Sequence, residues 1–291
     1  MAIDRFFYKK DGKELSRLGK VLTEPVEFSH AGPEWQEIVG KRRLIKPARK
    51  LLQQALNFLL RGLKITGKEN IEKNSTTGRL IIAPHMSNLD FPAIKKALKT
   101  KPYAIAGIAA LSEESHQSIF TLSMFEDTSL LLPTIPPQNL ADFKDRELKR
   151  KLLENTRTTI IEALCSGHDV VLFPAGTRAN NEEELPGNYD KAKRFTADIA
   201  NEVITRTGAL TILAVSIYGT QQRMPRNNKF GLWQALLNRN SPKLEIAQPY
   251  DVTRNDTDKI IPNAWLTHKE TIEKMKEQSP QNHSNTPTSS I

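Results

Sequence analysis

Three apolar runs of strand length constrain the fold of this chain more than any other feature. They cover residues 79–83, 169–173 and 210–217. Short, nearly uninterrupted apolar runs are typical of strands that are covered on both faces, as in parallel sheets. Helical patterns alternate with them, over residues 91–98, 144–165 and 189–205. The alternation predicts an α/β fold in which a mixed, partly parallel sheet is flanked by helices.

The sequence also predicts how the chain divides into a main domain and flanking segments. Residues 1–40 show little periodicity and predict a loosely structured N-terminal arm, and the polar residues 279–291 predict a disordered tail. The main domain is expected over residues 67–278, with a C-terminal extension that holds a possible strand at 243–247. Residues 103–111 are apolar and fit a strand or a helix.

Residues 41–64 contain eight basic side chains and no acidic one, so this window holds +8 of the formal net charge of +9. Its apolar residues recur with the period of one helix face, which predicts an N-terminal basic amphipathic helix over residues 41–66. The helix is either an ordinary surface helix or a contact with an anionic membrane surface through residues 41–64. Nucleic acid is not an expected partner, because no recognisable nucleic-acid-binding motif accompanies the charge.

The composition also bears on the compartment. The longest uncharged stretch, residues 207–222, is shorter than the roughly 20 mostly apolar residues of a spanning helix. The first residues include an acid and lack an apolar core, so a secretory signal is not expected. Cys165 is the single cysteine, which excludes an internal disulfide and agrees with a reducing compartment. We therefore expect a cytoplasmic protein, and the membrane alternative for residues 41–64 would place it peripheral to the inner face of a membrane.

The most informative polar residues are His85 and Asp90, which follow the strand predicted at 79–83. Ser87 or Asn88 is suited to cap the next helix, which places the Asp90 carboxylate where it can fold back toward His85. A carboxylate that accepts a hydrogen bond from Nδ1 of a histidine leaves Nε2 free to take a proton from a hydroxyl. The spacing is that of a general base and its orienting acid, although such pairs also occur in purely structural roles.

The sequence offers no pattern for a metal site. No second histidine and no carboxylate cluster with ligand spacing lies near His85, so no metal is expected. Four other histidines have unpatterned surroundings and are expected at the surface: His30, His116, His268 and His283.

A second polar segment, residues 173–178, follows the strand predicted at 169–173. Its glycine turn brings backbone N–H groups and the guanidinium of Arg178 toward the crevice in which α/β proteins bind ligands. Such groups suit a phosphate. A tight turn with a solvated Arg178 is equally compatible with these residues.

Taken together, the two segments resemble the PlsC-like lysophosphatidic acid and glycerol-3-phosphate acyltransferases. The His-x4-Asp block of that family appears here as residues 85–90, and its Phe-Pro-Glu-Gly-Thr-Arg block appears as Phe-Pro-Ala-Gly-Thr-Arg at residues 173–178. The order and separation of the blocks also fit the family. The resemblance covers roughly residues 64–220 and makes residues 67–278 an expected acyltransferase domain.

The resemblance implies transfer of a fatty acyl group to a hydroxyl of a glycerol-phosphate or lysophospholipid acceptor. Acyl-CoA or acyl-carrier protein would be the donor co-substrate, and neither a cofactor nor a metal would be needed. His85 would act as the general base, and Asp90 would orient it. Four further residues are expected to bind substrate: Ser87, Gly176, Thr177 and Arg178.

Three departures from the family pattern bear on the acceptor. Ala175 stands where the family usually has Glu, and the last strand block lacks its usual Pro. The intermediate block has no clean counterpart, and Arg146 or Arg150 is the candidate substitute. These departures keep two alternatives open, namely a non-catalytic lipid- or phosphate-binding homologue and an acyl thioesterase that uses water as the acceptor.

Overall fold

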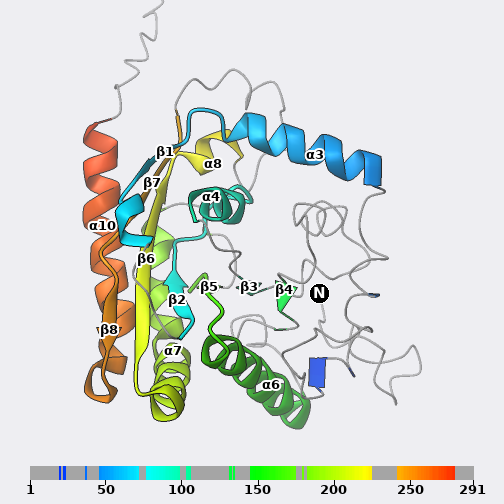
Figure 1. Cartoon of the computed structure of the whole chain (residues 1–291), viewed down its shortest axis with the longest axis vertical. Coiled ribbons are helices and arrows are strands. Elements are labelled where there is room, and N and C mark those ends of the chain that lie inside the picture. Colours follow the sequence, from blue (N-terminus) through cyan, green and yellow to red (C-terminus); the bar gives the residue numbers. More distant parts are fainter. Residues whose placement is uncertain are drawn as a thin grey trace, which may run out of the picture.

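The computed structural model places eight strands, among the residues it describes, in one sheet of order β1-β7-β6-β2-β5-β3-β4, with β8 paired to β6 (Figure 1). The residues described are 20, 22–23, 37, 46–71, 77–98, 103–105, 131–132, 134, 145–174, 179, 182–224 and 241–278. Most of the predicted arm at 1–40 and the whole predicted tail at 279–291 lie outside these ranges. None of the described helices is long and apolar enough to cross a bilayer.

Strand β2 (Arg79–Ile82) lies at the centre of the sheet, between β5 (Val170–Leu172) and β6 (Leu210–Tyr218). It is parallel to both, and Ile82 is in register with Leu172 and with Ala214. Every residue of β2 and β5 is buried, as the apolar runs predict. Because the three strands are parallel, the segments that follow them leave the sheet at the same edge, where α/β folds build their sites.

The outer strands make the sheet mixed. β1 (Lys64–Thr66) is parallel to β7 (Lys243–Ile246), whereas β7 and β8 (Tyr250–Val252) are both antiparallel to β6. At the other edge, β3 (Tyr103–Ile105) is parallel to β5 and to β4 (Leu131–Leu132). The expected α/β fold with a partly parallel sheet is confirmed. The C-terminal extension belongs to this same sheet, since it supplies β7 and β8.

Helices cover both faces of the sheet (Figure 1). α7 (Leu185–Thr207), α10 (Ile260–Glu277) and the C-terminal half of α6 (Arg146–Cys165) contribute to one apolar cluster with the residues of β2 and β6 that face them. α4 (Asp90–Ala97) and the end of α3 (Lys46–Leu59) contribute to the cluster on the opposite face. The predicted helices at 91–98, 144–165 and 189–205 are therefore present, although α7 begins four residues earlier than expected.

The helix predicted over residues 41–66 ends earlier than expected. α3 ends at Leu59, and residues 64–66 form strand β1, so the C-terminal boundary of that prediction was wrong. Gly62 has a φ of 76°, a left-handed conformation that L side chains rarely adopt, and it turns the chain between helix and strand. Leu56 and Leu59 are buried, whereas Leu51 and Phe58 are exposed.

A buried ion pair lies at the amino end of β2, away from the edge at which the parallel strands end. The backbone N–H and Nε of Arg79 donate to Oδ1 of Asp169 at 3.0 Å each, and Nη2 of Arg79 donates to Oδ2 at 2.6 Å. Both side chains are less than a tenth exposed. Nη1 of Arg79 donates in addition to the carbonyl of Ile71 at 2.7 Å, so this pair connects the starts of β2 and β5 to the loop after β1.

Replacing Asp169 with Asn is expected to lower the free energy of unfolding by about 3 kcal/mol, because it leaves a buried guanidinium without its counter-charge. Chemical denaturation followed by circular dichroism measures this change. Asp256→Asn is the matched control, since Asp256 pairs with Lys259 at the exposed surface. The control is expected to unfold like the wild-type protein. Equal effects of the two variants would contradict the role given to the buried pair.

Candidate active site

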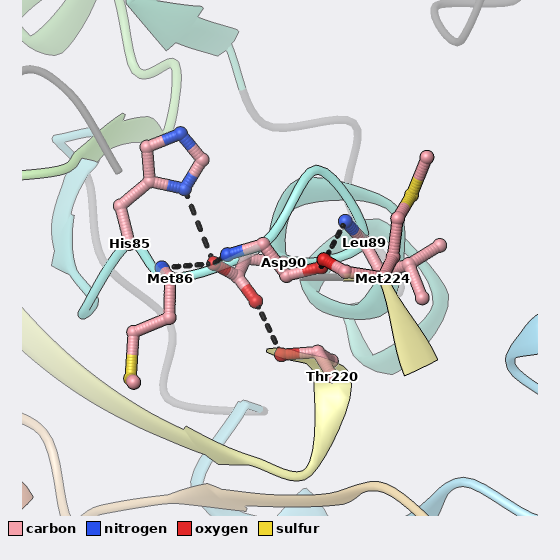
Figure 2. Close-up of polar contacts among 7 residues, drawn as sticks. His85, Met86, Leu89, Asp90, Thr220 and Met224 are labelled. Carbon is pink, nitrogen blue, oxygen red and sulfur yellow. Dashed lines mark hydrogen bonds and ion pairs between the residues drawn. The ribbon is translucent and has the colours of Figure 1, made fainter. Parts of the chain in front are cut away.

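His85 and Asp90 are brought together by the loop that follows β2 (Figure 2). Nδ1 of His85 lies 3.1 Å from Oδ2 of Asp90. A carboxylate only accepts hydrogen bonds, so the proton of the neutral imidazole is assigned to Nδ1, and Nε2 is left as an acceptor. Figure 2 shows this second nitrogen on the side of the ring that faces away from Asp90. The geometry is that of a general base held by a carboxylate.

The carboxylate of Asp90 is 1% exposed and is held by the loop itself. The backbone N–H groups of Met86 and Ser87 each donate to its Oδ2 at 2.7 Å. The loop therefore wraps around the carboxylate at the first residue of α4. Since the side chain of His85 is 21% exposed, the pair combines a buried carboxylate with an accessible imidazole.

Ser87 is fully buried and makes its contacts inside the protein. Its Oγ donates to the carbonyl of Met224 at 3.0 Å and accepts from the N–H of Leu89 at 3.1 Å. Leu89 precedes α4 as its N-cap residue, and no side chain caps the helix there. The geometry favours a role for Ser87 in holding the loop, and its predicted contact with substrate stays a prediction.

Thr220 is a residue of this site that the sequence did not single out. Its Oγ1 donates to Oδ1 of Asp90 at 2.6 Å, and its side chain is 1% exposed. Thr220 begins the one-turn helix α8 (Thr220–Arg223), directly after Gly219, which has a φ of 88° and turns the chain out of β6. The signal that points to it is its place just beyond a strand that is parallel to β2.

The segment after β5 approaches the ring of His85 from a second direction. The ring of Phe173 stacks on that of His85, with 4.3 Å between centroids and 25° between planes. The N–H of Ala179 donates to the carbonyl of His85 at 2.7 Å. Residues 175–178 lie outside the described part of the chain, so the structure does not test the predicted roles of Gly176, Thr177 and Arg178.

The arginines considered for the intermediate family block lie on α6. Arg146 and Arg150 are both exposed, and Arg150 forms a long ion pair of 3.9 Å with Glu154 one turn further along the helix. Among the described residues, neither arginine forms a hydrogen bond or an ion pair with the loop that carries His85. The part of the intermediate block before residue 145 lies almost wholly outside the described residues.

His268 is not a surface residue, so that prediction was wrong. It is fully buried on α10, where Nδ1 pairs with the hydroxyl of Tyr189 and Nε2 lies 3.2 Å from the carbonyl of Ile82. Burial lowers the pKa of His268 to about 3, although the hydrogen bond with the carbonyl of Ile82 raises it in part. Burial also raises the pKa of Tyr189. The neutral ring therefore joins α7 and α10 to the end of β2, three residues before His85.

The described residues contain no group of three or more His, Cys, Asp or Glu side chains that could hold a metal ion. The polar groups around His85 are instead a single carboxylate, backbone N–H groups and hydroxyls. With these groups, the imidazole of His85 can accept a proton, and the carboxylate of Asp90 can hold the ring in one orientation.

Residues 62–217 match the sequence model of the family named Acyltransferase, which is more than half of the 291-residue chain. The chain belongs to the acyltransferase family. The matched region of this acyltransferase includes β1, β2, β5 and nearly all of β6, together with His85, Asp90 and residues 173–178. Thr220 follows the end of the matched region by three residues.

The solved structures that are similar to this acyltransferase include the 1-acyl-sn-glycerophosphate (LPA) acyltransferase PlsC from Thermotoga maritima. The sequence identity is 17%, the alignment covers 82% of this chain and 87% of that chain, and the TM-score is 0.46. No curated protein sequence matches the chain.

The buried His268 predicts a specific loss of stability in acid. Its pKa is about 3 in the folded state and about 6.5 when unfolded, so only the unfolded chain binds its proton between these values. The free energy of unfolding should therefore fall by about 1.4 kcal/mol per pH unit from this residue as the pH drops below 6.5. Denaturation at pH 7 and pH 4.5 measures the difference.

His268→Gln is expected to lose less stability between these two pH values than the wild-type protein, because an amide does not titrate. His168→Gln, at an exposed histidine, is the control and should keep the wild-type difference. An unchanged acid loss in His268→Gln would refute the assignment.

Proposed function

We propose that this acyltransferase moves a fatty acyl group from an acyl thioester to a hydroxyl of a glycerol-phosphate or lysophospholipid acceptor. The donor is acyl-CoA or acyl-carrier protein, His85 is the general base, and Asp90 orients it. The observation that carries the proposal is the 3.1 Å contact between Nδ1 of His85 and the buried carboxylate of Asp90, in a chain of the acyltransferase family. The product would serve phospholipid synthesis.

The reaction follows from the position of the free ring nitrogen. Nε2 of His85 takes the proton of the acceptor hydroxyl while the oxygen attacks the thioester carbonyl carbon. The C–O bond forms, the tetrahedral intermediate collapses, and the C–S bond breaks. The thiolate then takes the proton from Nε2, so His85 ends the cycle neutral. Asp90 stabilises the imidazolium that exists between the two transfers.

No cofactor or metal is needed in this scheme, because the thioester is already activated and His85 supplies both proton transfers. No covalent enzyme intermediate is needed either, since the acceptor oxygen attacks the donor directly. The chain's own contribution is to hold one imidazole in one tautomer beside the reacting groups.

The proposal assigns the phosphate of the acceptor to Gly176, Thr177 and Arg178. A backbone N–H group, a hydroxyl and a guanidinium together suit a phosphate, and Arg binds it through two parallel hydrogen bonds. Support comes from the residues on either side of this segment, since both Phe173 and Ala179 contact His85. Ser87, whose hydroxyl is already engaged with Met224 and Leu89, is given a role in holding the loop.

We further propose that the enzyme binds the inner, cytoplasmic face of an anionic membrane through the basic segment at 41–64. Two large apolar side chains of α3 are open to solvent, with Leu51 68% and Phe58 47% exposed. Seven residues apart on one helix, they lie on the same face. Lys46 and Lys50 are exposed on the same helix. Apolar side chains flanked by cations are the pattern of a helix that lies in a membrane interface.

Purified full-length protein with labelled long-chain acyl-CoA tests the reaction. Glycerol-3-phosphate, lysophosphatidic acid in vesicles and a zwitterionic lysolipid are offered as separate acceptors. His85→Ala is expected to lower transfer by about 100- to 10,000-fold, because it removes the general base. Asp90→Asn should lose most of the activity as well, since an amide can donate to Nδ1 and leave the proton on Nε2. His168→Ala is the control for loss of a histidine and should stay active.

Other outcomes of this assay decide between the candidate functions. Label released as free fatty acid, with none in an acceptor, would make the protein a thioesterase. No turnover with either acyl-CoA or acyl-carrier protein would favour the non-catalytic homologue. Full activity in His85→Ala, with an unchanged melting temperature, would overturn the assignment of the base.

Vesicle sedimentation tests the membrane contact. The double variant Leu51→Ser/Phe58→Ser is expected to bind vesicles of anionic phospholipid at least 10-fold more weakly, because each side chain loses apolar burial in the interface. Lys46→Gln and Lys50→Gln should each weaken binding about fivefold, and less so in high salt. Leu266→Ser, which removes an exposed apolar residue from α10, is the control. Equal binding by the double variant and this control would exclude α3 as the contact.

A further inference from the structure

The one-turn helix α8 touches the candidate active site at one end and α3 at the other. At its start, the hydroxyl of Thr220 donates to Oδ1 of Asp90 at 2.6 Å. Just past its end, the carbonyl of Met224 accepts from Oγ of Ser87 at 3.0 Å. Both contacts are buried, and both hold the loop that carries His85. Figure 2 shows the contact between Thr220 and Asp90. A shift of α8 would therefore change the loop around the catalytic carboxylate.

Arg223, the last residue of α8, binds the C-terminal end of α3. Its Nη1 donates to the carbonyl of Leu59 at 2.6 Å and to that of Arg61 at 3.2 Å. Arg223 is 9% exposed, and burial lowers the pKa of its guanidinium. Because a buried cation needs hydrogen-bond acceptors, these carbonyls fix its position. α3 has no basic residue in its own last turn. The guanidinium of Arg223 therefore supplies the positive charge that stabilises the partial negative charge at the C-terminus of α3.

α4 makes the same connection along a second path. It begins at Asp90, and Lys96 in its last turn donates to the carbonyl of Leu60 at 3.3 Å. α4 thus begins at Asp90 and α8 begins at a residue that binds its carboxylate, and each helix places a cation at the end of α3. Displacement of that end would remove the acceptors of both Arg223 and Lys96.

We propose that Thr220 and Arg223 are positioning residues for acyl transfer, and that α8 makes the orientation of Asp90 depend on where the end of α3 is seated. The inference rests on the proposed function, because it needs Asp90 to orient a catalytic His85. Thr220 acts through Asp90, and Arg223 acts through Thr220. The helix that exposes Leu51 and Phe58 is thereby joined to the Asp90 carboxylate by the side chains of Arg223 and Thr220 and by the one helical turn between them.

Steady-state kinetics of the full-length enzyme test the role of Thr220. Thr220→Val is expected to lower kcat about 10- to 100-fold, because it removes a hydrogen bond to a charged group, while KM for the acceptor stays within about twofold. Thr220→Ser keeps the hydroxyl and is expected to restore most of kcat. Thr211→Val is the matched control, since Thr211 lies at the opposite end of β6 and donates to Asp251 at the same distance of 2.6 Å. This control should keep the wild-type kcat.

A double-mutant cycle tests the connection to α3. Arg223→Gln is expected to lower kcat about 2- to 30-fold. If Arg223 acts through Thr220, the double variant Thr220→Val/Arg223→Gln should be no slower than Thr220→Val alone. Arg223→Lys keeps a cation and should recover part of the loss. Melting temperatures, measured by circular dichroism, identify variants whose activity is lost through unfolding.

The outcomes separate this inference from the proposed function. Wild-type kcat in Thr220→Val, or effects of Thr220→Val and Arg223→Gln that multiply, would overturn the positioning role while His85→Ala remains inactive. An equal loss in Thr211→Val and Thr220→Val would also overturn it, because the effect would then be one of stability. Activity in His85→Ala would instead refute the proposed function itself.

Discussion

Burial of the Asp90 carboxylate is the constraint on which the rest of the site depends. A carboxylate removed from water must find its hydrogen-bond donors in the protein, because unpaired burial of a charge is very costly. Here the donors come from the loop after β2, from the ring of His85 and from Thr220 at the start of α8. The carboxylate therefore sets the shape of the loop and the tautomer of the ring at once, and it ties both to the end of β6.

Each end of β2 carries a pair formed by a buried aspartate and a basic side chain, and the two pairs differ in what the basic side chain can do. At its amino end, Asp169 pairs with Arg79, and both side chains are closed off from solvent. At its carboxyl end, Asp90 pairs with His85, whose ring keeps about a fifth of its surface open. Arginine does not release its proton in proteins, so the first pair stabilises the fold. An imidazole can both take up and release a proton, so the second pair is suited to proton transfer.

Much of this arrangement follows from the sequence because the signals are local. Apolar runs and helical periods predicted β2, β5, β6, α4, α6 and α7 to within a few residues, and the spacing of His85 and Asp90 predicted their pairing. The boundary of α3 was missed, since the basic and apolar pattern continues past Leu59 while Gly62 and the pairing of β1 with β7 end the helix. β8 and α10 were not predicted, although both pack against β6.

Contacts between distant residues were decided by the tertiary structure alone. Thr220 lies 130 residues from Asp90, and His268 lies 186 residues from Ile82, so no local pattern relates them. These contacts depend on which strands are neighbours in the sheet and on which face of the sheet α10 covers. Both follow from the summed burial of many apolar side chains. The sequence by itself determined the central strands, the helices α4, α6 and α7, and the pairing of His85 with Asp90. Only the packed sheet decided what holds the Asp90 carboxylate in place, because parallel strands bring the segments that follow them to one edge wherever they occur in the chain.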